Sequence, residues 1–280
     1  MERRTEGLLN GERASPLNIQ ARAVCRSTMA NVVIVVPCYN EEKRLDRASF
    51  LAFKNPSHTV KFLFVNDGST DNTLQILESL RTSNSDGFSV LSLPQNQGKA
   101  EAVRQGILTA LDSKPAYIGF WDADLATPLD TISQFLDFSE NRPELSMIIG
   151  ARVKLLGREI QRKSSRHYLG RVFATAASAV LGLSVYDSQC GAKLFRVSPL
   201  VTDLFQQRFQ SRWIFDVEIL ARLIKISRAQ GILQADRVIY EFPLTEWRDI
   251  AGSKVRFYDF IKAGWELYRI HRKYFRSSRS

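Results

Sequence analysis

The chain has 280 residues, of which 44% are hydrophobic and 24% charged, and this ordinary globular composition supports a sizeable core. Its length allows one large or two small domains. The formal net charge of +10 predicts an anionic partner: nucleic acid, a phosphorylated substrate or an anionic membrane surface.

Simple counts exclude several classes of protein. The three cysteines show no metal-ligand spacing, and their odd count argues against a disulfide framework, so a reducing, cytoplasmic compartment is expected. No run reaches the 18 apolar residues that a membrane-spanning helix requires. Residues 1–30 hold scattered arginines without an apolar core segment, so they do not form a secretory signal, and we expect a poorly ordered arm.

From residue 31, strand-like and helix-like stretches alternate at short spacing. The β-branched run Val32–Val36, ended by Pro37, is typical of a strand that is buried on both faces. Further strands are expected at 60–65, 88–93, 116–121 and 145–149, and helices at 42–53, from 70 or 71, at 98–111 and at 129–138. This alternation predicts an α/β fold with a mainly parallel central sheet and flanking helices.

The second half is less regular and more basic. Cations crowd residues 152–171, and after them we expect a helix at 172–183, a strand at 190–197, a helix at 215–226 and a strand at 235–240. A basic amphipathic helix and tail should occupy 255–280. With no internal repeat or low-complexity linker, residues 31–254 are predicted to form one domain. The apolar helix and the basic tail could lie peripherally on an anionic, cytoplasmic membrane face; alternatively, the helix is core and the tail solvated.

Polar clusters follow three of the predicted strands, at residues 37–41, at 66–69 and at Asp122 and Asp124. Ligands of such sheets bind outside the carboxyl ends of the strands, so the clusters should converge. Two carboxylates one residue apart can hold a hard divalent cation that keeps other positions for water and phosphate oxygens. The alternative is an acidic turn before a helix capped by Thr127, with Pro128 at its first position.

Three further features have two interpretations each. Asp67 could accept hydrogen bonds from a base or ribose, or stabilise its own turn. Lys99 opens a helix, where free N–H groups suit an anion, or it is a solvated lysine. Arg158, Arg162 and Arg166 would share one helix face and clamp a phosphate, or form a solvated basic surface.

Together these stretches resemble a known family. Residues 36–42 (VPCYNEE), 65–71 (VNDGSTD) and 122–124 (DAD) resemble the inverting family 2 glycosyltransferases of the GT-A fold. Within that family, residues 187–195 (DSQCGAKLF), 212–218 (RWIFDVE) and 247–254 (WRDIAGSK) resemble the dolichyl-phosphate β-glucosyltransferases. The resemblance covers roughly residues 31 to 268.

The resemblance implies inverting transfer of glucose from UDP-glucose to a polyprenyl phosphate, with Mg²⁺ or Mn²⁺ as the cofactor. The metal would be held by Asp122 and Asp124. The implied donor-binding residues are Pro37, Tyr39, Glu41, Asp67, Lys99, Asp122, Ala123 and Asp124. The implied acceptor-phosphate residues are Arg152, Arg162, Arg166, Gln189 and Lys193. Asp124, Asp187, Arg162 and Arg166 are the candidate catalytic residues.

Two departures concern the acceptor. Eukaryotic members carry an N-terminal membrane anchor that this sequence does not show, and Ala192 stands where those members often have Phe. A soluble family 2 transferase acting on a glycan or other hydroxyl is therefore the alternative, and it would need a base, for which Asp187 is the first candidate. Nucleic-acid binding is disfavoured, because the basic residues are not interleaved with stacking aromatics.

Overall fold

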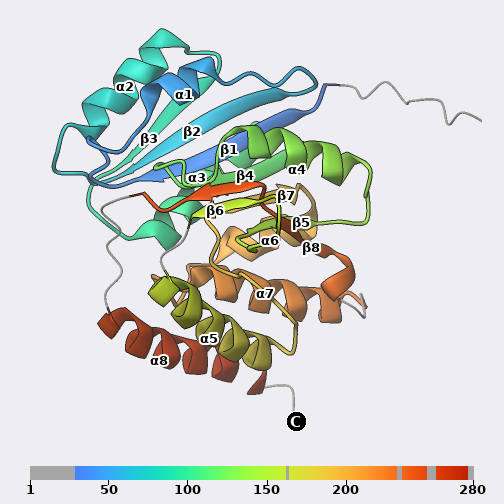
Figure 1. Ribbon diagram of the computed structural model, residues 1–280. Helices are drawn as coiled ribbons and strands as arrows, with labels where there is room; N and C mark the ends of the chain where they lie inside the picture. The colour runs from blue at the N-terminus through green and yellow to red at the C-terminus, as the bar shows by residue number, and fades with distance from the viewer. Residues whose placement is uncertain (1–28, 162–163, 232–234, 251–256, 277–280) are drawn as a thin grey trace, which may run out of the picture.

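The computed structural model describes residues 29–161, 164–231, 235–250 and 257–276 (Figure 1). Its centre is a seven-stranded sheet in the order β3-β2-β1-β4-β7-β5-β8. The strands of this sheet are β1 (Asn31–Cys38), β2 (Thr59–Asp67), β3 (Phe88–Leu93), β4 (Tyr117–Trp121), β5 (Met147–Ala151), β7 (Ala192–Arg196) and β8 (Ile239–Pro243). The short strands β6 (Glu159–Gln161) and β9 (Glu246–Arg248) pair separately.

The predicted mainly parallel sheet with flanking helices is confirmed. Strands β1 to β4 are mutually parallel, and so are β5 and β8. Strand β7 is antiparallel to both β4 and β5, and it joins the two parallel groups. The carboxyl ends of β1, β2 and β4 therefore meet at one edge, as the strand-end clusters require.

Helices cover both faces of the sheet (Figure 1). They are α1 (Arg47–Ala52), α2 (Thr73–Ser83), α3 (Lys99–Leu111), α4 (Asp130–Glu140), α5 (Ser164–Leu181), α6 (Pro199–Gln206), α7 (Phe215–Ala229) and α8 (Phe257–Tyr274). Alternate residues of β1 point to opposite faces, so Ile34 packs in the cluster with α1, α2 and α4, and Val35 in the cluster with α3, α6 and α7. No helix among the described residues combines the length and apolar content needed to cross a bilayer.

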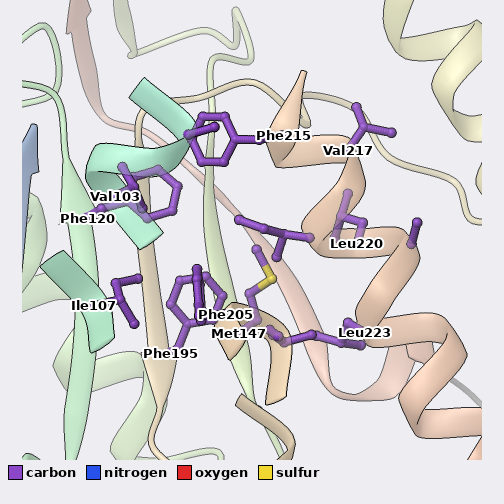
Figure 2. Close-up of a cluster of buried hydrophobic side chains, with 14 of the residues drawn as sticks. Val103, Ile107, Phe120, Met147, Phe195, Phe205, Phe215, Val217, Leu220 and Leu223 are labelled. Atoms are coloured by element: carbon purple, nitrogen blue, oxygen red, sulfur yellow. The ribbon is translucent and has the colours of Figure 1, made fainter. Parts of the chain in front are cut away.

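The larger of the two cores lies between the sheet and the helices α3, α6 and α7. Figure 2 shows Phe120 of β4, Phe195 of β7 and Met147 of β5 facing side chains of α3 and α7. Helix α8 contributes Ala263, Leu267, Ile270 and Tyr274 to the same core. Helix α8 therefore packs as part of the same core as the sheet and α7. The domain boundary expected at residue 254 stays a prediction.

Several expected elements have different bounds. The helix expected at 42–53 is confined to α1, where Asp46 caps it by accepting a hydrogen bond from the Ser49 N–H. Helix α4 begins at Asp130 without a side-chain cap, so Thr127 is not its N-cap. The expected strand 235–240 is a 3₁₀ turn at Ala235–Arg237 followed by β8, and α5 begins eight residues earlier than expected.

The prediction that Arg158, Arg162 and Arg166 share one helix face is wrong. Strand β6 lies between Arg158 and Arg162, so Arg158 precedes a strand and cannot share a helix face with Arg166. Spacings of four residues suit a helix, but pairing of β6 with β9 decides the local conformation here. Arg162 and the side chain of Arg166 lie outside the described residues.

Candidate active site

A cavity of about 420 Å³ opens at the carboxyl ends of β1, β2 and β4. All eight residues predicted to bind the donor line it: Pro37, Tyr39, Glu41, Asp67, Lys99, Asp122, Ala123 and Asp124. The sequence analysis missed the other lining residues, which are Cys38, Arg44, Asn96, Gly98, Ala102 and Trp213. The parallel strands bring the three separate sequence clusters into one site.

The acidic pair follows β4 in a tight turn. Leu125 adopts a left-handed backbone conformation with φ of 51°, and its N–H bonds the Asp122 carbonyl oxygen at 3.2 Å. Such a conformation is costly for leucine and is found where function constrains the chain. Burial, followed by the nearby Asp122 charge, raises the pKa of Asp124.

Lys99 is the cation that faces this pair. Its Nζ lies 2.5 Å from Asp122 Oδ1. Burial acts to lower the pKa of Lys99, but the carboxylates of Asp122 and Asp216 prevail and raise it. The first residue of α3 therefore brings a protonated ammonium to the acidic turn, where it pairs with Asp122, and its contact with a bound anion stays a prediction.

The residues present fit a divalent cation bound together with a substrate. Asp122 and Asp124 line the cavity one residue apart, and within the described residues no third Asp, Glu, His or Cys joins them in a cluster that could hold a metal ion. Gly191 packs directly on the pair: a Cβ at this position would lie 1.8 Å from Asp122 Oδ2. Two aspartates leave most positions of an octahedral ion to water and phosphate oxygens, as expected for Mg²⁺ or Mn²⁺.

Asp67 holds the loop that precedes α3. Its carboxylate accepts hydrogen bonds from the Gln97 N–H at 2.7 Å, the Gly98 N–H at 2.8 Å and Asn96 Nδ2 at 3.0 Å. Burial raises its pKa, and the two backbone N–H groups act in the opposite direction. Of its two interpretations, the structure therefore shows a loop-stabilising role, although across β2 and α3 rather than within its own turn.

Arg44 connects the donor cavity to a second one. Its guanidinium pairs with Glu41 and lies 3.9 Å from Asp124 Oδ2. The neighbouring cavity, of about 840 Å³, shares Arg44 and Asp124 and extends along α1, the turn before α4 and β9. No motif pointed to Arg44, whose position depends on the turn that follows β1.

Arg152 and Asp187 form a rigid pair beside the cavity. Asp187 Oδ2 accepts from Arg152 Nε at 2.6 Å and from its N–H at 3.1 Å, and Oδ1 accepts from Nη2 at 2.7 Å. Asp187 is itself held through its backbone N–H, which donates to Glu241. Arg152 also lies over the Trp247 ring, with Cζ 5.2 Å from the centroid. These contacts fix the guanidinium at the end of β5.

Lys193 and Gln189 flank this pair differently. Lys193 is fully buried, and its Nζ lies 2.6 Å from both Asp216 Oδ1 and the Cys190 carbonyl oxygen. Its ammonium thus faces Asp216, and this buried ion pair is explained by a structural role. The predicted contact of Lys193 with an acceptor phosphate stays a prediction. Gln189 is half-buried. The predicted roles of Arg162 and Arg166 lie outside the described side chains and stay predictions.

The loop that carries Trp213 into the cavity is held from α7 and α8. Glu218 Oε2 accepts from the N–H groups of Gln210 and Ser211, and the Ser211 hydroxyl bonds Glu266 of α8. Arg222 donates to carbonyl oxygens of the same loop, and Tyr274 of α8 donates to Glu218 Oε1 at 2.8 Å. This buried network ties one wall of the donor cavity to the last helix.

Comparison with known proteins agrees with this site. Residues 33–202 match the glycosyl transferase family 2 profile. The chain is 32% identical over 248 residues to the dolichyl-phosphate beta-glucosyltransferase ALG5C of Trichomonas vaginalis, covering 84% of this chain and 69% of the relative. It is 32% identical to the enzyme of that name from Saccharomyces cerevisiae (86% and 74% covered) and 30% identical to that of Homo sapiens (86% and 75%).

Solved structures share the fold. Glucosyl-3-phosphoglycerate synthase of Mycobacterium tuberculosis matches with a TM-score of 0.58 and 16% identity, covering 87% of this chain and 80% of that chain. The mannosyltransferase PcManGT of Pyrobaculum calidifontis, solved with GDP-Man and Mn²⁺, matches with a TM-score of 0.54 and 16% identity, covering 88% and 64%. The resemblance noted from the motifs is thus confirmed: the chain belongs to glycosyl transferase family 2, and it is a glycosyltransferase with the GT-A fold.

Proposed function

We propose that this enzyme transfers glucose from UDP-glucose to a polyprenyl phosphate of the dolichyl type, with inversion at the anomeric carbon. The observation that carries the proposal is the convergence of the donor set on one cavity, together with an Arg152 guanidinium that Asp187 holds in a fixed orientation. The relatives named dolichyl-phosphate beta-glucosyltransferase support both the sugar and the acceptor class.

On the donor side, the diphosphate would lie at the acidic turn. Asp122 and Asp124 would hold Mg²⁺ or Mn²⁺, which as a Lewis acid stabilises the charge of the leaving nucleoside diphosphate when bound. Lys99 adds a fixed positive charge at the start of α3. Asp67, Tyr39 and Trp213 would shape the part of the cavity that receives the uridine.

On the acceptor side, the chemistry needs positioning more than a base. A phosphate monoester is ionised at neutral pH, so its oxygen can attack the anomeric carbon while the bond from that carbon to the β-phosphate oxygen of UDP breaks. No proton has to be removed from the nucleophile. Arg152, and on the predicted assignment Arg162 and Arg166, would orient the phosphate through bidentate hydrogen bonds.

The arrangement of Asp187 speaks against its use as the general base that a hydroxyl acceptor would need. A general base needs a free carboxylate oxygen within hydrogen-bond reach of the proton that it removes. Both oxygens of Asp187 accept hydrogen bonds from Arg152, and the side chain is buried. Asp187 therefore suits the role of a positioning residue for Arg152.

The test is to incubate the enzyme with labelled UDP-glucose, polyprenyl phosphate and Mg²⁺ or Mn²⁺, and to measure label in the organic phase. Extractable label should require both the lipid and the metal, and GDP-mannose should not replace UDP-glucose. The Asp124→Asn variant should be inactive, whereas Asp137→Asn, an exposed aspartate on α4, should match the wild type. Label found only in a water-soluble product would overturn the proposed acceptor.

A further inference from the structure

Helices α5 and α8 form the outermost layer of the molecule, on the far side of α7 from the sheet (Figure 1). They pack against each other and against α7. Phe173, Ala177 and Leu181 of α5 and Leu267 and Ile270 of α8 point into the core. The opposite faces of the two helices point away from the protein.

The outer face of α8 combines aromatic rings with cations. Trp265 is 63% exposed and Tyr268 46%, and their rings lie together with centroids 5.6 Å apart. The exposed residues that share this stripe are Lys262, Trp265, Tyr268, Arg269, Arg272 and Arg276. Tryptophan and tyrosine beside arginine and lysine are typical of surfaces that meet lipid head groups.

From residue 168 onward, where its side chains are described, the outer face of α5 is uncharged and largely apolar. Tyr168 is 71% exposed and Val172 is 70% exposed. The exposed positions that continue their stripe are Thr175, Ala176 and Ala179. Arg171 is turned aside, because it donates to the Tyr186 carbonyl oxygen and lies over the Tyr186 ring.

The electrostatics of this surface favour an anionic partner. Helix α5 contains no aspartate or glutamate. In the described part of α8, from residue 262 onward, the single acidic side chain is Glu266, which is buried and bonded to Ser211. Among the described side chains of the two helices, residues 168–181 and 262–274, no exposed acid therefore faces these cations.

We propose that the outer face of α5 and α8, defined by Tyr168, Val172, Trp265, Tyr268, Arg269 and Arg272, docks on the surface of a bilayer that contains anionic lipids. The aromatic side chains would enter the head-group layer and the arginines would contact lipid phosphates. The proposal rests on the proposed function for its choice of occupant, since a polyprenyl phosphate is a membrane lipid. Both helices begin on the side where β1 and β2 end, which is also the side of the candidate site (Figure 1).

The test is cosedimentation of the full chain with vesicles, without donor or acceptor. Binding should be stronger to phosphatidylcholine vesicles with phosphatidylserine than to phosphatidylcholine alone, and it should weaken with salt. Arg269→Gln with Arg272→Gln should reduce the partition coefficient about 25-fold, since each cation near an anionic surface contributes about fivefold. Trp265→Ser with Tyr268→Ser should reduce it about tenfold or more.

Matched controls separate this face from general effects. Leu51→Ser removes an apolar side chain that is 44% exposed on α1, and Lys61→Gln with Arg237→Gln removes two exposed cations elsewhere. Both controls should bind vesicles like the wild type. Equal losses in controls and test variants, or no vesicle binding by the wild type, would overturn the proposal.

Two further measurements distinguish failure of the docking proposal from failure of the proposed function, and a membrane from other occupants of this face. Transfer to detergent-dissolved polyprenyl phosphate should be unchanged in the Trp265→Ser/Tyr268→Ser variant, so a failure of transfer in all variants would count against the proposed function and not against docking. If the exposed aromatics instead form an interface between two copies of the chain, light scattering would detect the dimer. If residues 1–28 cover them, deletion of those residues would expose them. Either result, without vesicle binding, contradicts the membrane surface.

Discussion

Replacing Gly191 by alanine tests the geometry of the acidic pair directly. A Cβ at this position would lie 1.8 Å from Asp122 Oδ2 and 2.2 Å from its Cγ, whereas real Cβ atoms stay at least 3.0 Å from such neighbours. The Asp122 carboxylate must therefore move by more than about 1 Å, which disturbs its 2.5 Å contact with the Lys99 Nζ. A misplacement of about 1 Å in an active site costs about 100-fold in rate.

The expected result is a loss of transfer of about 100-fold or more, with little loss of stability. An off-rotamer aspartate costs about 0.5–1.5 kcal/mol, which urea unfolding can measure. The control is Gly264→Ala on α8, where a Cβ meets no heavy atom within 4 Å. That variant should retain full activity and gain up to about 1 kcal/mol from helix propensity. Near wild-type transfer by Gly191→Ala would refute the assigned role of Asp122.

Three more substitutions probe the pair at Arg152, the packing of α3 on the sheet and the buried carboxylate of Glu101 on α3. Asp187→Asn should lower kcat/KM about 10- to 100-fold, since a hydrogen bond to a charged group contributes about 1.5–3 kcal/mol. Kinetics should show a raised KM for the acceptor and an unchanged pH profile, and loss of a basic limb instead would indicate a base. Gly106→Ala should destabilise the fold by about 1–3 kcal/mol in urea, because its Cβ would lie 2.5 Å from a Val35 methyl carbon; an unchanged midpoint would contradict this packing. Burial acts to raise the pKa of Glu101, but hydrogen bonds from Arg104 prevail and lower it. The stability that Glu101 contributes is therefore present above its unfolded pKa of about 4.3 and lost as the pH falls through the lower folded value. The Glu101→Gln variant should have a lower free energy of unfolding than the wild type, and this difference should shrink below pH about 4. A difference independent of pH would refute the stabilising role of the Glu101 carboxylate.

The donor cavity could be predicted because short sequence patterns identify each strand and the polar residues that follow it. A β-branched run such as Val32–Val36 indicates a buried strand, and polar residues after several parallel strands must meet at one edge. Asp67, Asp122 and Lys99 were found in this way. Trp213 lies in one of the motifs that carry the family resemblance, but its place in the wall of the donor cavity was not predicted.

The errors lie where tertiary pairing decides the local structure. Arg158, Arg162 and Arg166 have helical spacing, but β6 forms between the first two because β9 is available as a partner. The strand pattern at residues 192–196 gives no direction, so the antiparallel insertion of β7 could not be predicted. The ion pair of Lys193 with Asp216 was not predicted either, because no sequence pattern shows that Asp216 faces this ammonium.

The attachment of the Trp213 loop to α8 has a consequence for synthesis of the chain. Strands β1 to β4 with their helices are complete long before the ribosome reaches α8. The loop at 207–214, however, is held partly from α8, because Ser211 bonds Glu266 directly and Tyr274 bonds Glu218, the acceptor for the Gln210 and Ser211 N–H groups. The acidic turn can therefore form early, while the donor cavity acquires its final wall only when the C-terminal helix has emerged. A nascent or prematurely terminated chain would possess the acidic turn without the finished wall of the cavity beside it.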